Sequence, residues 1–451
     1  MNICIIGGGP TGMRLADELS SKGLNVELYE REKELGGCWK VDWEDGYFRE
    51  HSPRVMTTNY KNVIKLSKKL GVKTNTVYGN RFYTSYMFLS YFMNNTYSSD
   101  FLSIMNSITF MSKKDKRTLN EWMIDNDITE EGQRTLRKLA LSIATNEKEI
   151  LAYALFDALS QGQTSNFIQF SENDLWIKKW EEDLVSRPNV KIFKEREITS
   201  FQVKANNIVS CKSNGKEIKA DTFICAVPLY SLQNILKKSS DKVKDNWKEF
   251  DNFKDYCIKS SYSGFGFQLH FSQKINFKPT WKAKNFTDWD IEVLDVGKYS
   301  ENISENVSIQ QVLSCVIVDT NAKSTYLGKS PNELEDPNNI INESIRQLSL
   351  ANEIAIYPDK VTISDGLFYN KTKKFWDMKY SAFHPTKDGE LNPKGDIDNF
   401  FSVGPHNIYE VSLLENCFRS ADEFVKKYLK DIEIKNDSSI DIRTRIIPSD
   451  V

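Results

Sequence analysis

The sequence predicts an α/β protein that begins with a nucleotide-binding unit and continues through inserted segments. Three observations at the start of the chain support this prediction. Residues 3–6 form a short apolar run, a glycine-rich turn follows at residues 7–12, and a helical pattern continues to residue 22. A second strand pattern over residues 24–29 ends in the acidic residue Glu30. This order of strand, tight turn, helix, strand and acid is that of a Rossmann-like βαβ unit.

The turn carries the spacing G-x-G-x-x-G at Gly7, Gly9 and Gly12, with Thr11 inside it. Gly7 allows the sharp turn, Gly9 leaves room for a pyrophosphate, and Gly12 lets the helix pack closely on the strand. The helix then begins with free N–H groups and a partial positive charge, which favour a phosphate. Glu30 can accept both hydroxyls of a ribose. A glycine-rich turn without a ligand is the alternative.

A second glycine pair follows the acid. Arg31 and a short charged loop lead to Gly36-Gly37, and Cys38 and Trp39 come next. This arrangement resembles the FAD-binding fold of the glutathione-reductase type, in which such a loop returns to the pyrophosphate and leads toward the flavin ring. The resemblance implies that the dinucleotide is FAD and adds Arg31 and residues 36–39 to the expected cofactor site. A hairpin turn without a ligand is the alternative.

Composition narrows the class of protein. The 451 residues are enough for two or three domains, and the net charge of −2 gives no reason to expect nucleic acid as a partner. No apolar run approaches the ~20 residues of a membrane span, and a strand that begins at residue 2 leaves no room for a signal or transit peptide. The seven cysteines are scattered without a C-x-x-C, so we expect no metal site and a cytoplasmic, reducing location.

Residues 41–58 carry few helix signals, and residues 59–70 form an amphipathic helical pattern. The first of these segments contains His51, Arg54, Val55 and Met56. We include Arg54, Val55 and Met56 among the candidate cofactor-binding residues. For His51 and Arg54, a place in a surface loop is an equal alternative.

The next hundred residues predict an inserted helical region. Residues 83–110 are rich in aromatic side chains and Met, and residues 118–159 predict several helices, with a helix cap at Thr129. This region either walls a substrate pocket or forms a plain helical core.

An amphipathic helix is predicted over residues 175–184, followed by strands at 190–193, 197–203 and 208–211 and an apolar strand over 218–228. The last strand has the pattern A-D-x-x-I-x-A-x-P, from Ala220 to Pro228. Here the chain resembles the flavin-containing amine oxidase superfamily, which includes monoamine and polyamine oxidases and, more distantly, phytoene desaturases and protoporphyrinogen oxidase. The resemblance implies that the strand at Ile198 reaches the adenine through its backbone and that Ala226 lies where the FAD domain closes.

The C-terminal part extends the resemblance. Residues 400–407 resemble the motif F-F-A-G-E-H-T, and residues 412–421 resemble G-Y-V-E-G-A-V-x-S-G. In that family the first motif delivers a glycine, here Gly404, to the ribityl phosphate. The second starts a helix beneath the flavin, which implies that Leu413 and Leu414 lie at its N1–C2=O edge. No Cys stands at the family's attachment position, so we expect non-covalent FAD.

Residues 256–380 predict an α+β substrate domain on a mixed or antiparallel sheet, with strands at 265–271, 312–318 and 360–364 and a helix over 338–350. Residues 376–383 resemble the family's W…G-x-Y segment, which implies that Trp376, Tyr380 and Tyr409 wall the substrate site. A core position is the alternative for each. We expect an FAD-binding domain of residues 1–75, 185–235 and 390–432. The substrate domain has a helical part, 80–180, and a sheet part, 236–389, and a polar tail covers 433–451.

The predicted activity is that of an FAD-dependent oxidoreductase that removes a hydride from a C–H next to an amine, or from another activated C–H, to flavin N5. Its partner is a small-molecule substrate, a homodimer is left open, and no catalytic residue is assigned. The chain departs from the family motifs in four places. Cys38 stands for an arginine, Pro405 for an acid and residues 172–174 for a Gly-Gly pair, and residues 263–271 contain no lysine.

These departures keep three alternatives open. The first is a catalytically impaired flavoprotein with a structural or assembly role, and the second is a redox-neutral mutase or isomerase. The third is a flavin monooxygenase, because Gly37-Cys38-Trp39 also resembles the G-G-x-W of that class. A monooxygenase needs a second glycine fingerprint, and the other G-x-G, at Gly264 and Gly266, lacks a third glycine and a following helix.

Overall fold

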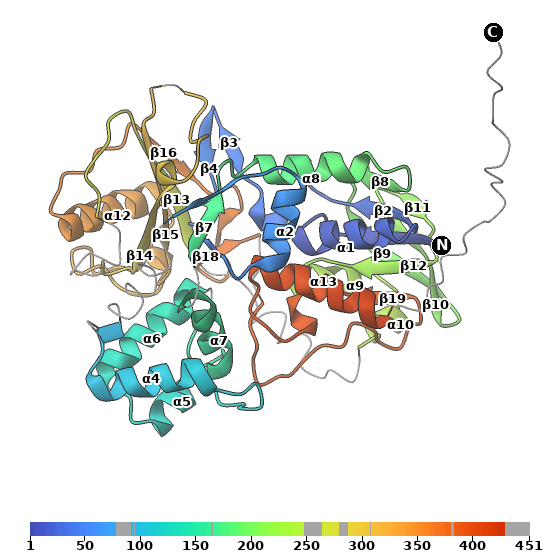
Figure 1. Ribbon diagram of the computed structural model, residues 1–451, viewed down its shortest axis with the longest axis horizontal. Coiled ribbons are helices and arrows are strands. Elements are labelled where there is room, and N and C mark those ends of the chain that lie inside the picture. Colours follow the sequence, from blue (N-terminus) through green and yellow to red (C-terminus); the bar gives the residue numbers. More distant parts are fainter. Residues whose placement is uncertain are drawn as a thin grey trace, which may run out of the picture.

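The computed structural model describes residues 1–77, 92–93, 95–143, 145–163, 166–247, 264–278, 287–306, 308–379 and 383–428. Figure 1 shows three groups of elements: a sheet flanked by α1 and α13, a cluster of helices α4 to α7, and a second sheet beside α12. The predicted tail of residues 433–451 and the wall residue Tyr380 lie outside the described residues.

The first group is built on a parallel five-stranded sheet with the order β19-β12-β1-β2-β8. Its strands are β1 (Asn2–Ile6), β2 (Asn25–Tyr29), β8 (Val190–Phe193), β12 (Thr222–Cys225) and β19 (Phe400–Ser402). All four pairings are parallel. Both faces of the sheet are covered at β1, β12 and β19, which explains why these strands are nearly continuous apolar runs. Segments from the start, middle and end of the chain therefore form one sheet, and the predicted discontinuous α/β class is confirmed.

Alternate residues of β1 enter two different cores. Ile3 and Ile5 pack under helices on one face, whereas Cys4 and Ile6 pack against a smaller sheet on the other. The helices of the first face are α1 (Pro10–Ser21), α2 (Lys61–Lys69), α8 (Leu175–Val185) and α13 (Leu414–Tyr428). The second face carries β9 (Ile198–Lys204), β10 (Asn207–Ser213), β11 (Lys216–Ile218), α9 (Leu229–Lys237) and α10 (Asp241–Lys244).

The single strand expected over residues 218–228 is wrong in its extent. Ile218 belongs to the antiparallel strand β11, and β12 begins only at Thr222. Between them the chain crosses from one sheet to the other, where the N–H of Asp221 donates to the carbonyl of Asn2 at 2.9 Å. An apolar run can be divided between two sheets, and the sequence pattern does not mark the division.

The helical insertion contains α4 (Ser98–Phe110), α5 (Leu119–Asp125), α6 (Glu130–Ser142) and α7 (Ala152–Gln163). The predicted cap at Thr129 is confirmed, because its side chain accepts from the N–H of Gly132 at the start of α6. Three strands that flank the insertion, two before it and one after it, lie in one small antiparallel sheet, β5-β7-β6. Their bounds are Met56–Thr57 for β5, Thr74–Thr76 for β6 and Phe167–Phe170 for β7. The chain therefore leaves and re-enters the first group at neighbouring points.

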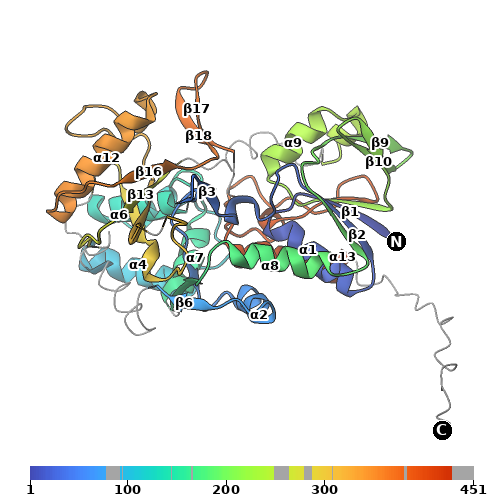
Figure 2. The same cartoon turned by 90° about the horizontal axis from the view of Figure 1, so that it is seen from above.

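The sheet predicted to belong to the substrate domain, called the substrate sheet below, has the order β14-β15-β13-β16 and is antiparallel throughout. Its strands are β13 (Phe265–Phe271), β14 (Ile291–Asp295), β15 (Gln311–Ile317) and β16 (Lys360–Ile363), and α12 (Pro337–Asn352) packs with one face in a common core. Figure 2 shows α12 and β16 at the end of the molecule opposite the N-terminus. The predicted α+β domain is confirmed.

Short elements connect these groups. They are β3 (Asp42–Glu44) paired with β4 (Tyr47–Arg49), β17 (Leu367–Asn370) paired with β18 (Phe375–Met378), and the 3-10 helices η1 (Gly37–Trp39), η3 (Val296–Lys298), η4 (Pro331–Glu333) and η5 (Pro405–Asn407). Across the described ranges, each helix is too short or too polar to cross a lipid bilayer.

Candidate functional site

The first glycine loop joins β1 to α1 and leaves an open cradle. Gly7 has φ +105°, and a Cβ there would lie 2.6 Å from the carbonyl oxygen of Ala226. A Cβ on Gly12 would lie 1.9 Å from the carbonyl oxygen of Gly7. Gly9 differs, because a Cβ on it would meet nothing within 4 Å. Two glycines thus close the turn, and the third faces open space at the N-terminus of a 12-residue helix.

Glu30 ties the end of β2 to this loop. Its two carboxylate oxygens accept from the N–H groups of Gly8 at 2.6 Å and Glu32 at 2.9 Å. The side chain is buried, and each oxygen has a second lone pair to offer a ribose hydroxyl. Contact with a ribose stays a prediction. Arg31 forms a partly exposed ion pair with Glu32 at 3.3 Å, and its contact with a cofactor stays a prediction.

The second glycine loop lies on the first. The N–H of Gly36 donates to the carbonyl of Gly8 at 2.8 Å, and a Cβ on Gly37 would lie 3.3 Å from the Cα of Gly9. Gly36 and Gly37 have φ +104° and +55°, a region that favours glycine. Cys38 follows in η1, and burial raises the pKa of its thiol. The structure therefore brings the two glycine loops together, as a shared pyrophosphate site requires.

The side chains of Arg54, Val55 and Met56 have different surroundings. The Arg54 guanidinium donates to the carbonyls of Trp39 at 2.6 Å and Lys40 at 2.8 Å, directly after the second glycine loop. Val55 is exposed, and Met56 is buried in β5. The structure thus joins Arg54 to the loop, whereas contact of Val55 and Met56 with a cofactor stays a prediction.

His51, left open between a site and a surface loop, lies against the substrate sheet. A Cβ on Gly266 of β13 would lie 1.9 Å from the carbonyl oxygen of His51. Burial and the neighbouring charge of Arg54 lower the pKa of His51 to about 3, so its imidazole is neutral at physiological pH.

The carboxyl ends of three neighbouring strands lie beside the first loop. The N–H of Ala226 donates to the carbonyl of Ile6 at 2.8 Å, and the N–H of Val403 donates to that of Cys225 at 2.9 Å. Gly404 follows with an extended backbone, and its N–H donates to Oδ1 of Asn407. Ligands of parallel α/β sheets bind at this edge.

Ile198 starts β9 and is buried. Two residues earlier, the N–H of Arg196 donates to the carbonyl of Glu30 at 2.8 Å. This bond holds the start of β9 beside the end of β2, where a dinucleotide's adenosine half would lie.

Helix α13 lies alongside α1. The Thr11 hydroxyl donates to the carbonyl of Cys417 at 3.5 Å, and Arg14 pairs with Asp422 at 2.7 Å. The start of α13 is thus held near the open cradle, with Leu414 buried and Leu413 half-buried. Contact of either residue with a flavin edge stays a prediction.

The two described residues of the predicted aromatic wall, Trp376 and Tyr409, are tightly packed. Trp376 is buried, and its Nε1 donates to the carbonyl of Leu334 at 2.9 Å. Tyr409 is buried, and its hydroxyl donates to the carbonyl of Thr386. Both polar atoms are used within the protein, which is the behaviour of core residues. Their role as a substrate wall stays a prediction.

An ion-pair group that was not predicted links the Gly-Gly loop to the substrate side. Lys40 and Lys379 both pair with Asp365, at 3.3 Å and 3.2 Å, and Lys379 also lies 3.6 Å from Glu32. Their signal in the sequence was weak, since isolated charges in loops are common.

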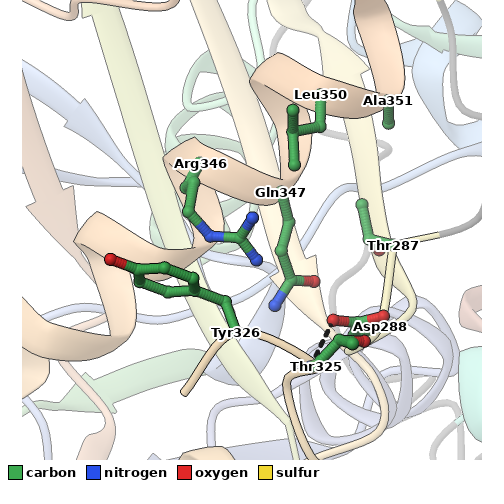
Figure 3. Close-up of a pocket in the computed structure, with 8 residues that line it drawn as sticks. All are labelled: Thr287, Asp288, Thr325, Tyr326, Arg346, Gln347, Leu350 and Ala351. Carbon is green, nitrogen blue, oxygen red and sulfur yellow. Dashed lines mark hydrogen bonds between the residues drawn. The ribbon is translucent and has the colours of Figure 1, made fainter.

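A separate pocket of about 480 Å³ lies on the substrate side, beside α12. Arg346 lies over the ring of Tyr326 at 4.7 Å, and Asp288 accepts from the N–H of Thr325, as Figure 3 shows. Arg346 is already paired with Glu343 at 2.6 Å. None of the predicted site residues lines this pocket. In the part of the chain that the structure describes, no group of three His, Cys, Asp or Glu side chains could hold a metal ion.

Comparison with known proteins identifies related chains. Residues 10–365, more than half of the sequence, match the family described as flavin-containing amine oxidoreductase. A senecionine N-oxygenase of Tyria jacobaeae is 36% identical over 61 residues. That match spans 14% of this chain and only 13% of the relative's length.

Solved structures share the fold over nearly the whole chain. An oxidoreductase from Methanosarcina mazei has a TM-score of 0.65 at 14% identity, covering 95% of this chain and 100% of that one. Putrescine oxidase bound to putrescine has a TM-score of 0.64 at 13% identity, covering 95% and 99%. Cyclohexylamine oxidase from Brevibacterium oxydans has a TM-score of 0.61 at 12% identity, covering 94% and 97%. At these identities the likeness concerns the fold alone.

Proposed function

The chain belongs to the flavin-containing amine oxidoreductase family, and from this we propose that it binds FAD non-covalently and oxidises a small amine. The single observation that carries the proposal is the open space at Gly9, beside which the Gly36-Gly37 loop lies. A pyrophosphate needs such a space beside a helix N-terminus.

The expected cofactor contacts follow the chain's own geometry. Gly7, Gly9 and Gly12 with the α1 N-terminus hold the phosphates, and the Glu30 carboxylate holds the ribose. The Gly-Gly loop and the start of α13 hold the other half of the cofactor. When bound, the flavin supplies the acceptor for a hydride from a C–H next to an amine nitrogen. The protein's share is to bind, to orient and to exclude water.

An amine substrate must be neutral to give up that hydride, so the rate should rise with pH toward the pKa of the amine. No side chain described above is assigned as a base. The cytoplasmic location and a homodimer remain predictions.

A flavoprotein without amine turnover is the second candidate, and one observation favours it. The family resemblance implies a lysine on the strand that corresponds to β13, and β13 contains none. Gly266 in this strand has no room for any side chain because of the His51 carbonyl. The monooxygenase alternative is weaker, since Gly266 lies within β13 and is followed by strand rather than by a helix.

Anaerobic reduction separates these candidates. The purified protein, reconstituted with FAD, is mixed without oxygen with a panel of primary amines, diamines and polyamines, and absorbance near the oxidised flavin peak is followed. Bleaching by one or more amines is the expected result. Bleaching by dithionite alone would support the non-catalytic candidate and contradict the proposed oxidase activity.

A further inference from the structure

The segment between β4 and β5 contacts both the substrate sheet and the cofactor loop. On the sheet side, Nε2 of Gln268 donates to the carbonyl of Glu50 at 2.9 Å, and Oε1 of Gln268 accepts from the N–H of Glu50 at 3.3 Å. Gln268 is fully buried in β13. Both backbone groups of one residue are thus paired with a single amide side chain, which fixes the register of this segment on the sheet.

On the loop side, the Arg54 guanidinium uses two nitrogens. Nη1 donates to the carbonyl of Trp39 and Nη2 to that of Lys40, at 2.6 Å and 2.8 Å. The guanidinium also lies 5.5 Å from the centre of the Trp39 ring. A planar fork can hold two successive carbonyls at once, which the single ammonium of a lysine cannot do in the same geometry.

Glu50 and Arg54 form an ion pair, Nε to Oε2 at 3.2 Å, in which the two side chains are 0% and 4% exposed. Replacing a buried ion pair by apolar side chains is often neutral or stabilising. Stability of the fold is therefore a poor explanation for these charges. The contacts of the Arg54 guanidinium with the two loop carbonyls offer a better one, and the Glu50 carboxylate holds that guanidinium next to the residue whose backbone is paired with Gln268.

We propose that Glu50, Arg54 and Gln268 form a buried brace that positions the Gly-Gly loop relative to the substrate sheet. Arg54 is its positioning residue, and it places a guanidinium beside the loop in which Cys38 stands at the family's arginine position. The inference rests on the proposed function in one respect: the braced loop is the one that would hold FAD. The brace transmits the position of β13 to that loop through Glu50.

Arg54→Lys tests the brace while it keeps the charge opposite Glu50. Arg49→Lys is the matched control, because Arg49 pairs with Asp42 in the neighbouring β3–β4 hairpin. Two quantities are measured: the Kd for FAD, and the hydrogen-exchange rate of the amides of residues 36–40 in cofactor-free protein. We expect Arg54→Lys to weaken FAD binding about tenfold, the scale of one charge-assisted hydrogen bond, and to speed loop exchange. Arg49→Lys should change neither.

Gln268→Met gives a second test from the other end of the brace. It should speed exchange of the same amides and weaken FAD binding by about threefold, since its effect passes through Glu50. If Arg54→Lys does not fold, the double variant Glu50→Leu with Arg54→Met removes both charges and should fold with fast loop exchange.

The brace would be refuted if the amides of residues 36–40 exchanged at the wild-type rate in Arg54→Lys or in the double variant. Failure of the proposed function is distinguishable from this result. A wild-type protein that binds no FAD refutes the proposed cofactor, while the exchange rates of cofactor-free protein still decide on the brace.

Discussion

The phosphate loop and the substrate sheet each depend on a glycine, but the two glycines have opposite surroundings. A Cβ on Gly9 would meet nothing within 4 Å, whereas a Cβ on Gly266 would lie 1.9 Å from the His51 carbonyl oxygen. The space at Gly9 is therefore open, and the proposed cofactor would use it. Gly266 has no side chain, and this absence allows the segment that carries Glu50 and Arg54 to lie directly on β13. The comparison teaches that a missing side chain serves two different purposes in this chain, an open space at Gly9 and close backbone packing at Gly266.

The difference extends to the two regions. The nucleotide side is built from backbone groups: positive φ values, free N–H groups at a helix start and strand ends. The substrate side is built from buried side chains that are paired with one another, such as Gln268, Thr362 and His270. Substitutions should therefore act on the ligand in the first region and on folding in the second.

Gly9→Glu should have the largest effect on the ligand. A carboxylate in the open cradle would repel and displace a pyrophosphate, so we expect at least about a hundredfold loss of FAD affinity. The thermal midpoint of the cofactor-free protein should stay close to wild type because the site has room. Gly9→Ala is the milder control, and titration followed by flavin fluorescence measures both. A Gly9→Glu protein that keeps wild-type affinity would show that the cradle lies elsewhere.

Acid should affect the folding of the substrate side and its neighbours. Burial lowers the pKa of His270 and His384 to about 4 and that of His406 to about 3. These folded-state pKa values lie below the ordinary value near 6.5. The contribution of the neutral histidines to the free energy of unfolding is therefore fully present above pH ~6.5 and is lost as the pH falls. With His51, whose pKa is also lowered to about 3, four such groups cost at most about 5.5 kcal/mol per pH unit between pH ~6 and ~4. Urea unfolding at a series of pH values measures this slope.

His384→Phe sharpens that test. Both ring nitrogens of His384 lack a hydrogen-bond partner among the described residues, whereas His270 contacts Thr362 and His406 contacts Ser402. The substitution should therefore leave the free energy of unfolding at pH 7 unchanged or raise it by about 1 kcal/mol. It should also reduce the dependence of that free energy on pH in acid by the amount that corresponds to one proton. His270→Phe is the control that should lose stability. An unchanged acid slope in His384→Phe would contradict a buried neutral imidazole.

Gly266→Ala should destabilise the fold by about 3 kcal/mol, since its Cβ overlaps a backbone oxygen that cannot rotate away. Gly297→Ala is the matched control on the same side, because its Cβ would meet no atom closer than 3.6 Å. Urea unfolding of the two variants gives the comparison. Equal stability of both would mean that β13 and the His51 segment are not in contact.

Glu415→Gln should have the smallest effect. The Glu415 carboxylate accepts from the N–H groups of Asn62 at 3.0 Å and Val63 at 3.1 Å, and so caps α2 from α13. Loss of the charge should cost about 1 kcal/mol. Glu423→Gln, on the exposed side of α13, should cost much less. If Glu415→Gln lowered the free energy of unfolding as little as Glu423→Gln does, the Glu415 carboxylate would not be a cap of α2.

The sequence predicted the backbone-built region well and the side-chain-built region poorly, for physical reasons. Spacing alone specifies a glycine turn before a helix, and strands such as β8 and β13 have the bounds that their alternation predicts. Short strands such as β5 and β6 have too few residues to show a period, and their common partner β7 lies far away in the sequence. Gln268 was missed although it left a signal, an amide among the phenylalanines of β13.

The central claim is that segments from both ends of the chain hold one FAD. Hydrogen exchange of the wild-type protein with and without saturating FAD tests it most directly. The claim predicts that amides of residues 7–12 and 36–38 and those of residues 404 and 413–414 slow together, at the same FAD concentration. Protection of the first set alone, or of neither, would contradict it.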